Sequence, residues 1–94
     1  MNYIKEILKK EDVALIDVRD PWEYEEGHVN HAVNIPLTEI PAKLDEFRKL
    51  NGPIILYCRS GNRSGTAVQL LRMAGILNVH NGGSIHDIQK IEAN

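Results

Sequence analysis

The chain has 94 residues, of which 43% are hydrophobic and 26% are charged, and its formal net charge is -2 at pH 7. This size and composition predict one domain, residues 1–94, with its own hydrophobic core, and the slightly acidic balance argues against a nucleic-acid-binding protein. The chain contains one cysteine, so an internal disulfide is excluded.

The N-terminal segment predicts a short amphipathic helix, because Ile4, Ile7 and Leu8 recur at helical spacing among charged residues. Residues 1–10 lack the apolar core and the cleavage site of a secretory signal, and no apolar run approaches the length that spans a membrane. We therefore expect a cytoplasmic protein that makes no membrane contact. A reducing compartment would also keep the cysteine as a thiol.

The next two predicted elements are a buried strand and a short helix. Residues 13–18 are almost continuously apolar, which is typical of a parallel strand covered on both faces. Asp20 and Pro21 predict the start of a helix, since Glu23 completes a capping box and proline is favoured at the first helical position. We expect Gly27 to end this helix.

The middle of the chain continues the alternation of strands and helices. Residues 32–35 predict a short strand, and Pro41 is expected to open a helix that ends at residues 51–53. Residues 54–57 predict a second buried strand, which is followed by a helix with a wide apolar face at residues 64–74.

The last part of the chain predicts one more strand and one more helix. Residues 76–79 are strand-like, residues 82–83 are expected to turn, and Ser84 is expected to cap a closing helix with isoleucines along one side. The alternation over the whole chain predicts an α/β fold, in which a mostly parallel sheet carries helices on both faces and right-handed crossovers join the strands.

The cysteine lies where a strand is expected to meet a helix. The carboxyl end of that strand would present Cys58 at the sheet edge where ligands of open α/β sheets bind. A helix starting near Ser64 would direct its N–H groups at the sulfur, while Arg59 and Arg63 add positive charge; both effects lower the pKa of a thiol. Gly61 allows successive N–H groups to point inward around an anion. The segment therefore predicts an anion-binding loop around a nucleophilic thiolate.

Two charged residues are expected at the same edge of the sheet. Asp17 and Arg19 lie at the carboxyl end of the first buried strand, so parallel strands would bring them close to Cys58. We expect the two side chains to be hydrogen-bonded there and to brace the loop.

Such a loop suits either phosphoryl or sulfur chemistry, and its length separates the two. Four residues lie between Cys58 and Arg63, whereas cysteine-dependent phosphatases place one more residue between their cysteine and arginine. The tighter loop fits a single sulfur atom held as a persulfide. A phosphatase also needs a carboxylic acid that protonates its leaving group. Nothing in the sequence indicates that Asp17 or Asp20 is placed to donate that proton. A phosphatase or arsenate reductase is therefore the less favoured alternative.

Several segments share a pattern that extends over most of the chain: LIDVRDPWEY at 15–24, EGHV at 26–29, AVNIPL at 32–37, CRSGNRS at 58–64 and GILNVHNGG at 75–83. Together they resemble single-domain rhodaneses, a family of thiosulfate sulfurtransferase-like proteins. The resemblance implies a three-layer fold with a five-stranded, mostly parallel sheet and helices on both faces. It also implies sulfur transfer through a cysteine persulfide, and we expect no cofactor.

The resemblance assigns roles by position. Cys58 would carry the sulfur, Arg59 would hold an anionic donor such as thiosulfate, and Arg63 would stabilise the sulfur anion with the loop amides. The acceptor would be cyanide in an assay or a thiol in the cell. A persulfide carrier that serves one protein of a sulfur relay is the alternative. The residues expected to bind substrate are Arg59, Ser60, Gly61, Asn62, Arg63 and Ser64.

The chain departs from the family pattern in three places. Asn30 and His31 stand where a Pro-Gly pair is common, which alters a turn. Ser60 occupies a position that is basic in rhodaneses specialised for thiosulfate, so weaker thiosulfate binding is expected. The segment after Gly83 lacks a tryptophan that is often found there. The histidines of the chain have no metal-ligand spacing, so we expect no metal site.

Overall fold

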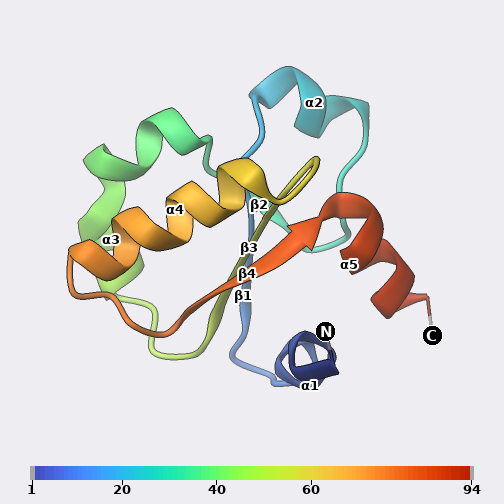
Figure 1. Cartoon of the computed structure of the whole chain (residues 1–94), viewed down its shortest axis with the longest axis horizontal. Coiled ribbons are helices and arrows are strands. Elements are labelled where there is room, and N and C mark those ends of the chain that lie inside the picture. The colour runs from blue at the N-terminus through green and yellow to red at the C-terminus, as the bar shows by residue number, and fades with distance from the viewer. Residues whose placement is uncertain (1, 94) are drawn as a thin grey trace.

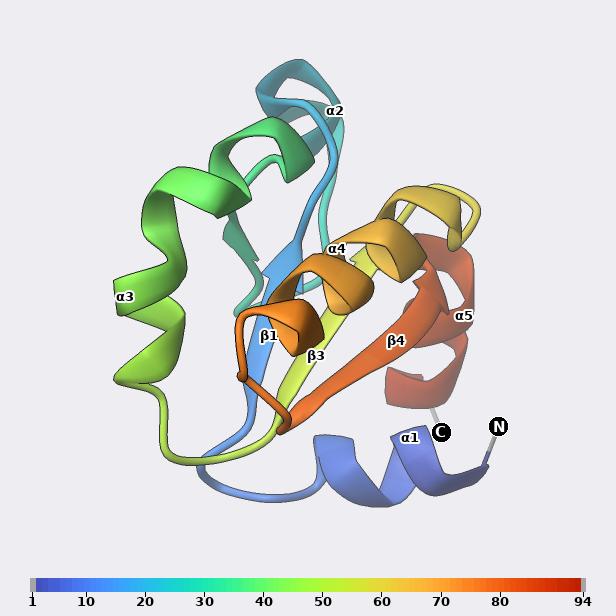
Figure 2. The same ribbon diagram turned by 60° about the vertical axis from the view of Figure 1, so that its left-hand side comes forward.

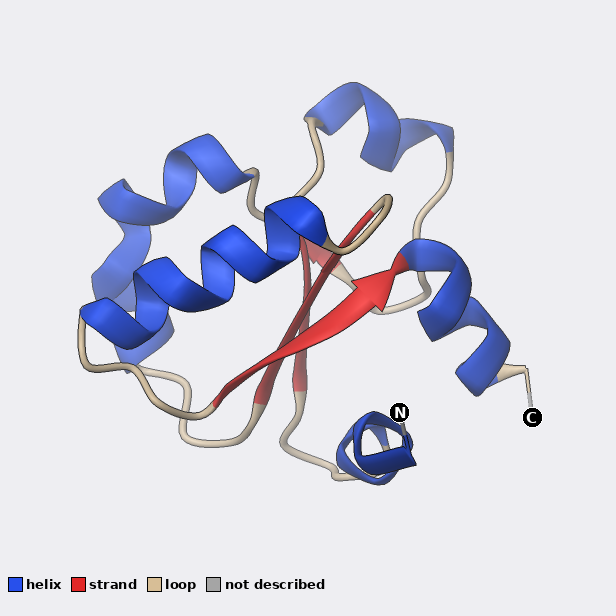
Figure 3. Ribbon diagram, in the orientation of Figure 1, coloured by secondary structure: helices blue, strands red, loops and turns tan. Residues whose placement is uncertain are grey.

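The computed structural model describes residues 2–93 of the chain. The elements are α1 (Asn2–Leu8), β1 (Ala14–Asp17), α2 (Pro21–Glu26), β2 (Val33–Asn34), the 3-10 helix η1 (Leu37–Lys43), α3 (Leu44–Arg48), β3 (Ile54–Cys58), α4 (Asn62–Met73), β4 (Val79–Ser84) and α5 (Ile85–Glu92). The strands form a parallel sheet in the order β2-β1-β3-β4 (Figure 3).

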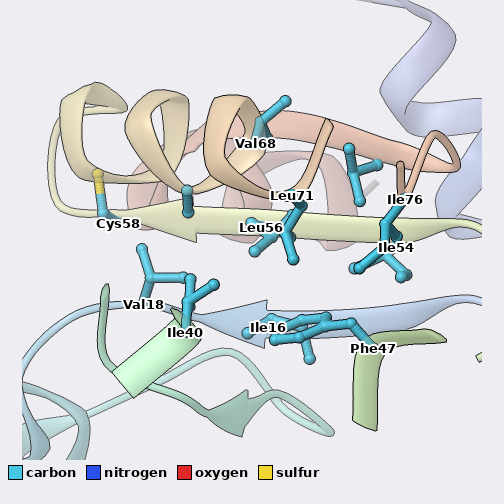
Figure 4. Close-up of a cluster of buried hydrophobic side chains, with 12 residues drawn as sticks. Ile16, Val18, Ile40, Phe47, Ile54, Leu56, Cys58, Val68, Leu71 and Ile76 are labelled. Carbon is cyan, nitrogen blue, oxygen red and sulfur yellow. The ribbon is translucent and has the colours of Figure 1, made fainter. Parts of the chain in front are cut away.

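Helices cover both faces of the sheet, which confirms the predicted α/β architecture. α3 and α4 lie on one face, and α1 and α5 lie on the other (Figures 1 and 2). Side chains of β3 alternate between these faces: Leu56 packs in the cluster that contains Leu71 of α4 (Figure 4), and Ile55 packs with Ile88 of α5. Every residue of β3 is therefore buried, which explains its continuously apolar sequence. None of the helices within residues 2–93 combines the length and the apolar character needed to cross a lipid bilayer.

Two helices start where the local capping signals predict. α2 begins at Pro21, and the backbone N–H of Asp20 donates to Oε1 of Glu23 at 2.9 Å. α5 begins after Ser84, whose Oγ accepts the N–H of Asp87 at 3.0 Å. In both cases a few adjacent residues satisfy the N–H groups that the first helical turn leaves without partners.

The expectation of a fifth strand is wrong for the described part of the chain, where the sheet has four strands. The segment before β1 forms helix α1 and a turn, and η1 and α3 occupy most of the connection between β2 and β3. These segments present apolar residues at helical spacing, so they pack onto the sheet and do not extend its edges.

The predicted start of the third α-helix at Pro41 is also wrong. Pro41 lies inside the 3-10 helix η1, and the α-helical segment α3 begins at Leu44. A short 3-10 turn is a common connector at a helix start. It places Ile40 in the core about two turns before α3 places Phe47 there.

The last strand runs later in the chain than predicted. β4 spans Val79–Ser84 and passes through both glycines that were expected to turn, with a β-bulge in its pairing with β3. Gly82 is buried, and a Cβ atom there would lie 2.8 Å from Ile55 and 2.9 Å from Ile88. The glycine therefore permits α5 to pack closely on the sheet, and it does not reverse the chain.

Candidate active site

Cys58 is the last residue of β3, so its side chain lies at the carboxyl edge of the sheet. Asp17 ends the neighbouring strand β1 and pairs in register with Tyr57. The parallel topology thus brings Asp17 and Arg19 to the same edge as Cys58, as the sequence predicts. Figure 4 shows the sulfur of Cys58 pointing from the end of β3 toward the first turn of α4.

The connection between Cys58 and α4 is shorter than predicted. α4 begins at Asn62 and not near Ser64, so residues 59–61 alone join the strand to the helix. Gly61 allows this short turn, because its φ of +94° lies in the left-handed region that favours glycine. The first turn of α4, whose N–H groups have no partners inside the helix, is thereby brought against the sulfur.

Backbone N–H groups and one hydroxyl group surround the sulfur of Cys58. The distances to Sγ are 3.0 Å from N of Gly61, 3.4 Å from N of Ser64 and 3.5 Å from Oγ of Ser64. Cys58 itself is 0% exposed. Burial raises the pKa of the thiol, but hydrogen bonds from Ser64, Ser60 and Gly61 outweigh burial and hold the pKa below its ordinary value. The site therefore favours the nucleophilic thiolate.

The hydroxyl of Ser64 is shared among several acceptors, although it has one hydrogen to donate. Its Oγ lies 2.7 Å from Oδ1 of Asn81, 3.2 Å from the carbonyl oxygen of Gly61 and 3.5 Å from Sγ of Cys58. The shortest of these contacts goes to Asn81. We therefore assign most of the anion stabilisation in the resting site to the backbone N–H groups and a smaller part to the hydroxyl.

Asn81 braces the turn from the neighbouring strand β4, and the sequence did not identify it as a site residue. Its Nδ2 donates to the carbonyl oxygen of Gly61 at 3.1 Å, and its Oδ1 accepts the N–H of Gly83 at 2.9 Å. Asparagine is uncommon inside strands. That unusual placement is the signal that could have identified it.

The side chain of Arg63 binds Glu23 of α2. Nη1 lies 2.7 Å from Oε1, and Nη2 lies 3.1 Å from Oε2. The hydrogen bonds from Arg63 outweigh the opposing effect of burial and lower the pKa of Glu23 to about 2. The pKa of Arg63 is raised, mainly by Glu23 and to a smaller extent by the nearby charge of Cys58. Within residues 2–93, the guanidinium donates hydrogen bonds to Glu23 and none to Cys58.

Asp17 and Arg19 form a buried pair, as predicted. Nε and Nη2 of Arg19 donate to the Asp17 carboxylate at 2.8 to 3.1 Å, and Nη2 also donates to the carbonyl oxygen of Gly27 at 2.7 Å. Asn34 donates to the carbonyl oxygens of both residues. The pair therefore ties the end of β1 to the end of α2. Among the described contacts it makes no hydrogen bond to residues 59–64.

The remaining predicted binding residues face solvent. Arg59, Ser60 and Asn62 are exposed. The side chain of Arg59 lies in a cleft beside α2 and is not hydrogen-bonded to any described residue. No group of three or more histidine, cysteine, aspartate or glutamate side chains in the described part of the chain is placed to hold a metal ion.

Comparison with known proteins identifies relatives of the chain. A family model for the rhodanese-like domain matches residues 1–87. An uncharacterized Bacillus subtilis protein, YqhL, is 45% identical over 67 residues; the match covers 71% of this chain and 52% of YqhL. The thiosulfate sulfurtransferase PspE of Escherichia coli is 38% identical over 74 residues, which cover 78% of this chain and 71% of PspE.

Similarity in three dimensions extends further along the chain. The structure of the human single-domain sulfurtransferase TSTD1 superposes with a TM-score of 0.77 at 25% identity, and the match covers 96% of this chain and 92% of TSTD1. The match to YqhL shows that the chain spans about half the length of that relative.

Proposed function

The chain belongs to the family of rhodanese-like domains, and on this premise we propose that it transfers sulfane sulfur from thiosulfate or another persulfide to a thiophilic acceptor. The observation that carries the proposal is the set of N–H groups around Cys58, with Gly61 at 3.0 Å and Ser64 at 3.4 Å from the sulfur. A persulfide keeps a negative charge on sulfur, and such a ring of donors stabilises that charge.

The proposed cycle has two displacement steps. The Cys58 thiolate attacks the outer sulfur of thiosulfate, a new S–S bond forms, and sulfite leaves with the electron pair of the broken S–S bond. Cyanide or a thiolate then attacks the terminal sulfur of the persulfide, and the electron pair of that bond returns to Cys58. Thiocyanate or a new persulfide is released and the thiolate is restored.

The residues of the turn have different roles in the proposed reaction. The backbone N–H groups of residues 60, 61 and 64 hold the anionic sulfur, and exposed Arg59 draws the anionic donor to the site. Arg63 adds a positive field near the sulfur while Glu23 fixes its position. Because Cys58 has no exposed surface, some of the residues that cover it must move before a donor makes contact.

The contacts of Asp17 argue against its use as the general acid of a phosphatase. A phosphatase would need a protonated carboxyl group beside the leaving oxygen. Asp17 is 0% exposed, and both of its carboxylate oxygens accept hydrogen bonds from Arg19. A carboxylate held in this way does not serve as a general acid for a group bound in the loop.

Intact-protein mass spectrometry after incubation with thiosulfate tests the proposal. We expect the protein to gain one sulfur atom, to lose it on addition of cyanide, and to gain none in the Cys58→Ser variant. Steady-state thiocyanate formation should saturate with thiosulfate. Loading by a cysteine desulfurase without turnover of thiosulfate would instead identify a persulfide carrier. Absence of the added sulfur with every donor would refute the proposal.

A further inference from the structure

A cleft of about 350 Å³ lies beside the turn that holds Cys58. It is bounded by α2, by Arg59 and by Ile85 at the start of α5, and these elements come together toward the upper right of Figure 1. A bulk water molecule occupies about 30 Å³, so the cleft has room for roughly ten waters. It is therefore larger than thiosulfate requires.

The cleft presents one unpaired charge of each sign. Arg19 and Glu23 line it, but they are bound to Asp17 and Arg63. Glu26 and Arg59 also line it, and neither forms an ion pair or side-chain hydrogen bond with another residue in the described range 2–93. A bound molecule that carries both a positive and a negative group would find a partner for each.

The position of Glu26 is unfavourable for the helix that carries it. Glu26 is the last residue of α2, where the helix dipole disfavours negative charge, and no basic residue lies in that last turn. The helix dipole therefore gives Glu26 no stabilising role in α2.

The apolar part of the cleft is supplied by Trp22 and Ile85. Trp22 is 62% exposed, which is unusual for a residue of its size, and Ile85 is partly buried beside it. These side chains would cover the carbon and sulfur atoms of a small molecule whose charged groups reach Glu26 and Arg59.

We infer that this cleft binds an amino-acid-derived thiol or persulfide, with its ammonium group at Glu26 and its carboxylate at Arg59. The inference rests on the proposed function for the sulfur that such a molecule gives or takes. Arg59 directly follows Cys58 at the carboxyl end of β3, so a molecule held by its guanidinium is held at the edge of the sheet where β3 ends. Thiosulfate carries no positive group and gains nothing from Glu26.

Fluorescence of Trp22, the only tryptophan of the chain, provides a direct test that requires no sulfur transfer. S-Methylcysteine has both charged groups but no reactive thiol, and we expect it to change the emission of Trp22 in a saturable manner. Glu26→Gln should raise its Kd about fivefold, the effect of losing one exposed charge contact. Glu25→Gln, which neutralises the neighbouring exposed residue outside the cleft, should leave Kd unchanged.

A related ligand tests whether Glu26 contacts the ammonium group. N-Acetyl-S-methylcysteine lacks the ammonium group, so its Kd should be the same for the protein and for Glu26→Gln. The inference is wrong if S-methylcysteine leaves the emission unchanged, or if Glu26→Gln affects the acetylated and free ligands equally. Because sulfur loading is measured separately, failure of this binding would leave the proposed sulfur transfer standing, and the reverse also holds.

Discussion

The carboxylate of Glu23 in α2 and the guanidinium of Arg63 in α4 are joined by two hydrogen bonds of 2.7 and 3.1 Å, although 40 positions separate them in the chain. The pair connects a helix outside the sheet to the helical turn that contacts Cys58. Because Arg63 immediately precedes Ser64, its anchorage also limits how far the N–H of Ser64 can move from the sulfur.

Glu23→Gln should lower the free energy of unfolding at pH 7 by about 1–2 kcal/mol, since the Arg63 side chain is partly exposed and solvent replaces some of the lost interaction. The pKa of Glu23 lies at about 2 in the folded protein, against an ordinary value of 4.5. Its stabilising effect is therefore complete above pH 4.5 and is lost as the pH falls toward 2. Urea unfolding between pH 7 and pH 2 should show a weaker pH dependence in the variant.

Glu25→Gln is the matched control, because Glu25 is an exposed residue on the same helix. It should change neither the unfolding free energy at pH 7 nor its acid dependence. Equal effects of the two substitutions would contradict a specific role for the Glu23–Arg63 pair.

Ser64→Ala should raise the pKa of Cys58 modestly, because the hydroxyl is one of several donors to the sulfur and its nearest acceptor is Asn81. The rate of alkylation by iodoacetamide as a function of pH gives this pKa directly. Thr66→Ala removes a hydroxyl of the same helix that bonds to the carbonyl oxygen of Asn62, and it should leave the profile unchanged. A rise of several pH units in Ser64→Ala would show that the hydroxyl, and not the backbone, dominates.

Gly82→Ala should lower the free energy of unfolding by about 1–3 kcal/mol, because a methyl group there would lie 2.8 Å from Ile55 and 2.9 Å from Ile88. Ile88→Val removes the Cδ1 atom that would lie 2.9 Å from the new methyl group. In the double variant the loss should be smaller than the sum of the two single losses. Strict additivity in chemical denaturation would indicate that Gly82 is needed for a reason other than close packing.

His31→Gly should raise the free energy of unfolding by about 0.5 kcal/mol. His31 is the one described residue other than glycine with a positive φ, which is +72°. A glycine there would avoid the steric cost of this conformation, about 1–2 kcal/mol. It would also add roughly 0.5–1 kcal/mol to the conformational entropy that the unfolded chain loses on folding. Asn30→Gly, which lacks the conformational benefit, should be destabilising. A drop in stability for His31→Gly under the same conditions would show that the imidazole itself stabilises the turn.

Features that depend on adjacent residues could be predicted from the sequence. The start of α2 follows from Asp20, Pro21 and Glu23, and the place of Cys58 at a strand end follows from the apolar run before it. The sequence also pointed to a turn at residues 30–31, where His31 has a positive φ that glycine adopts without steric cost.

Features created by contacts across the fold could not be predicted in this way. Glu23 meets Arg63 across 40 positions, and Ser64 meets Asn81 across 17. Gly82 has the local character of a turn residue, and only the approach of α5 to the sheet explains why it lies inside a strand. The residues next to Cys58 in the sequence thus predict an anion-binding loop. The contacts that hold this loop in place come from α2 and β4, which are distant in the sequence.

The complete burial of Cys58 also bears on its resistance to oxidation. A cysteine with a lowered pKa is ordinarily vulnerable to peroxide, and the chain has no second thiol that could capture a sulfenic acid as a disulfide. Oxidants need the same contact with the sulfur that the proposed sulfur donor would need, so the residues that cover Cys58 also limit its oxidation. A variant that opened the turn for faster loading would therefore be inactivated sooner by peroxide.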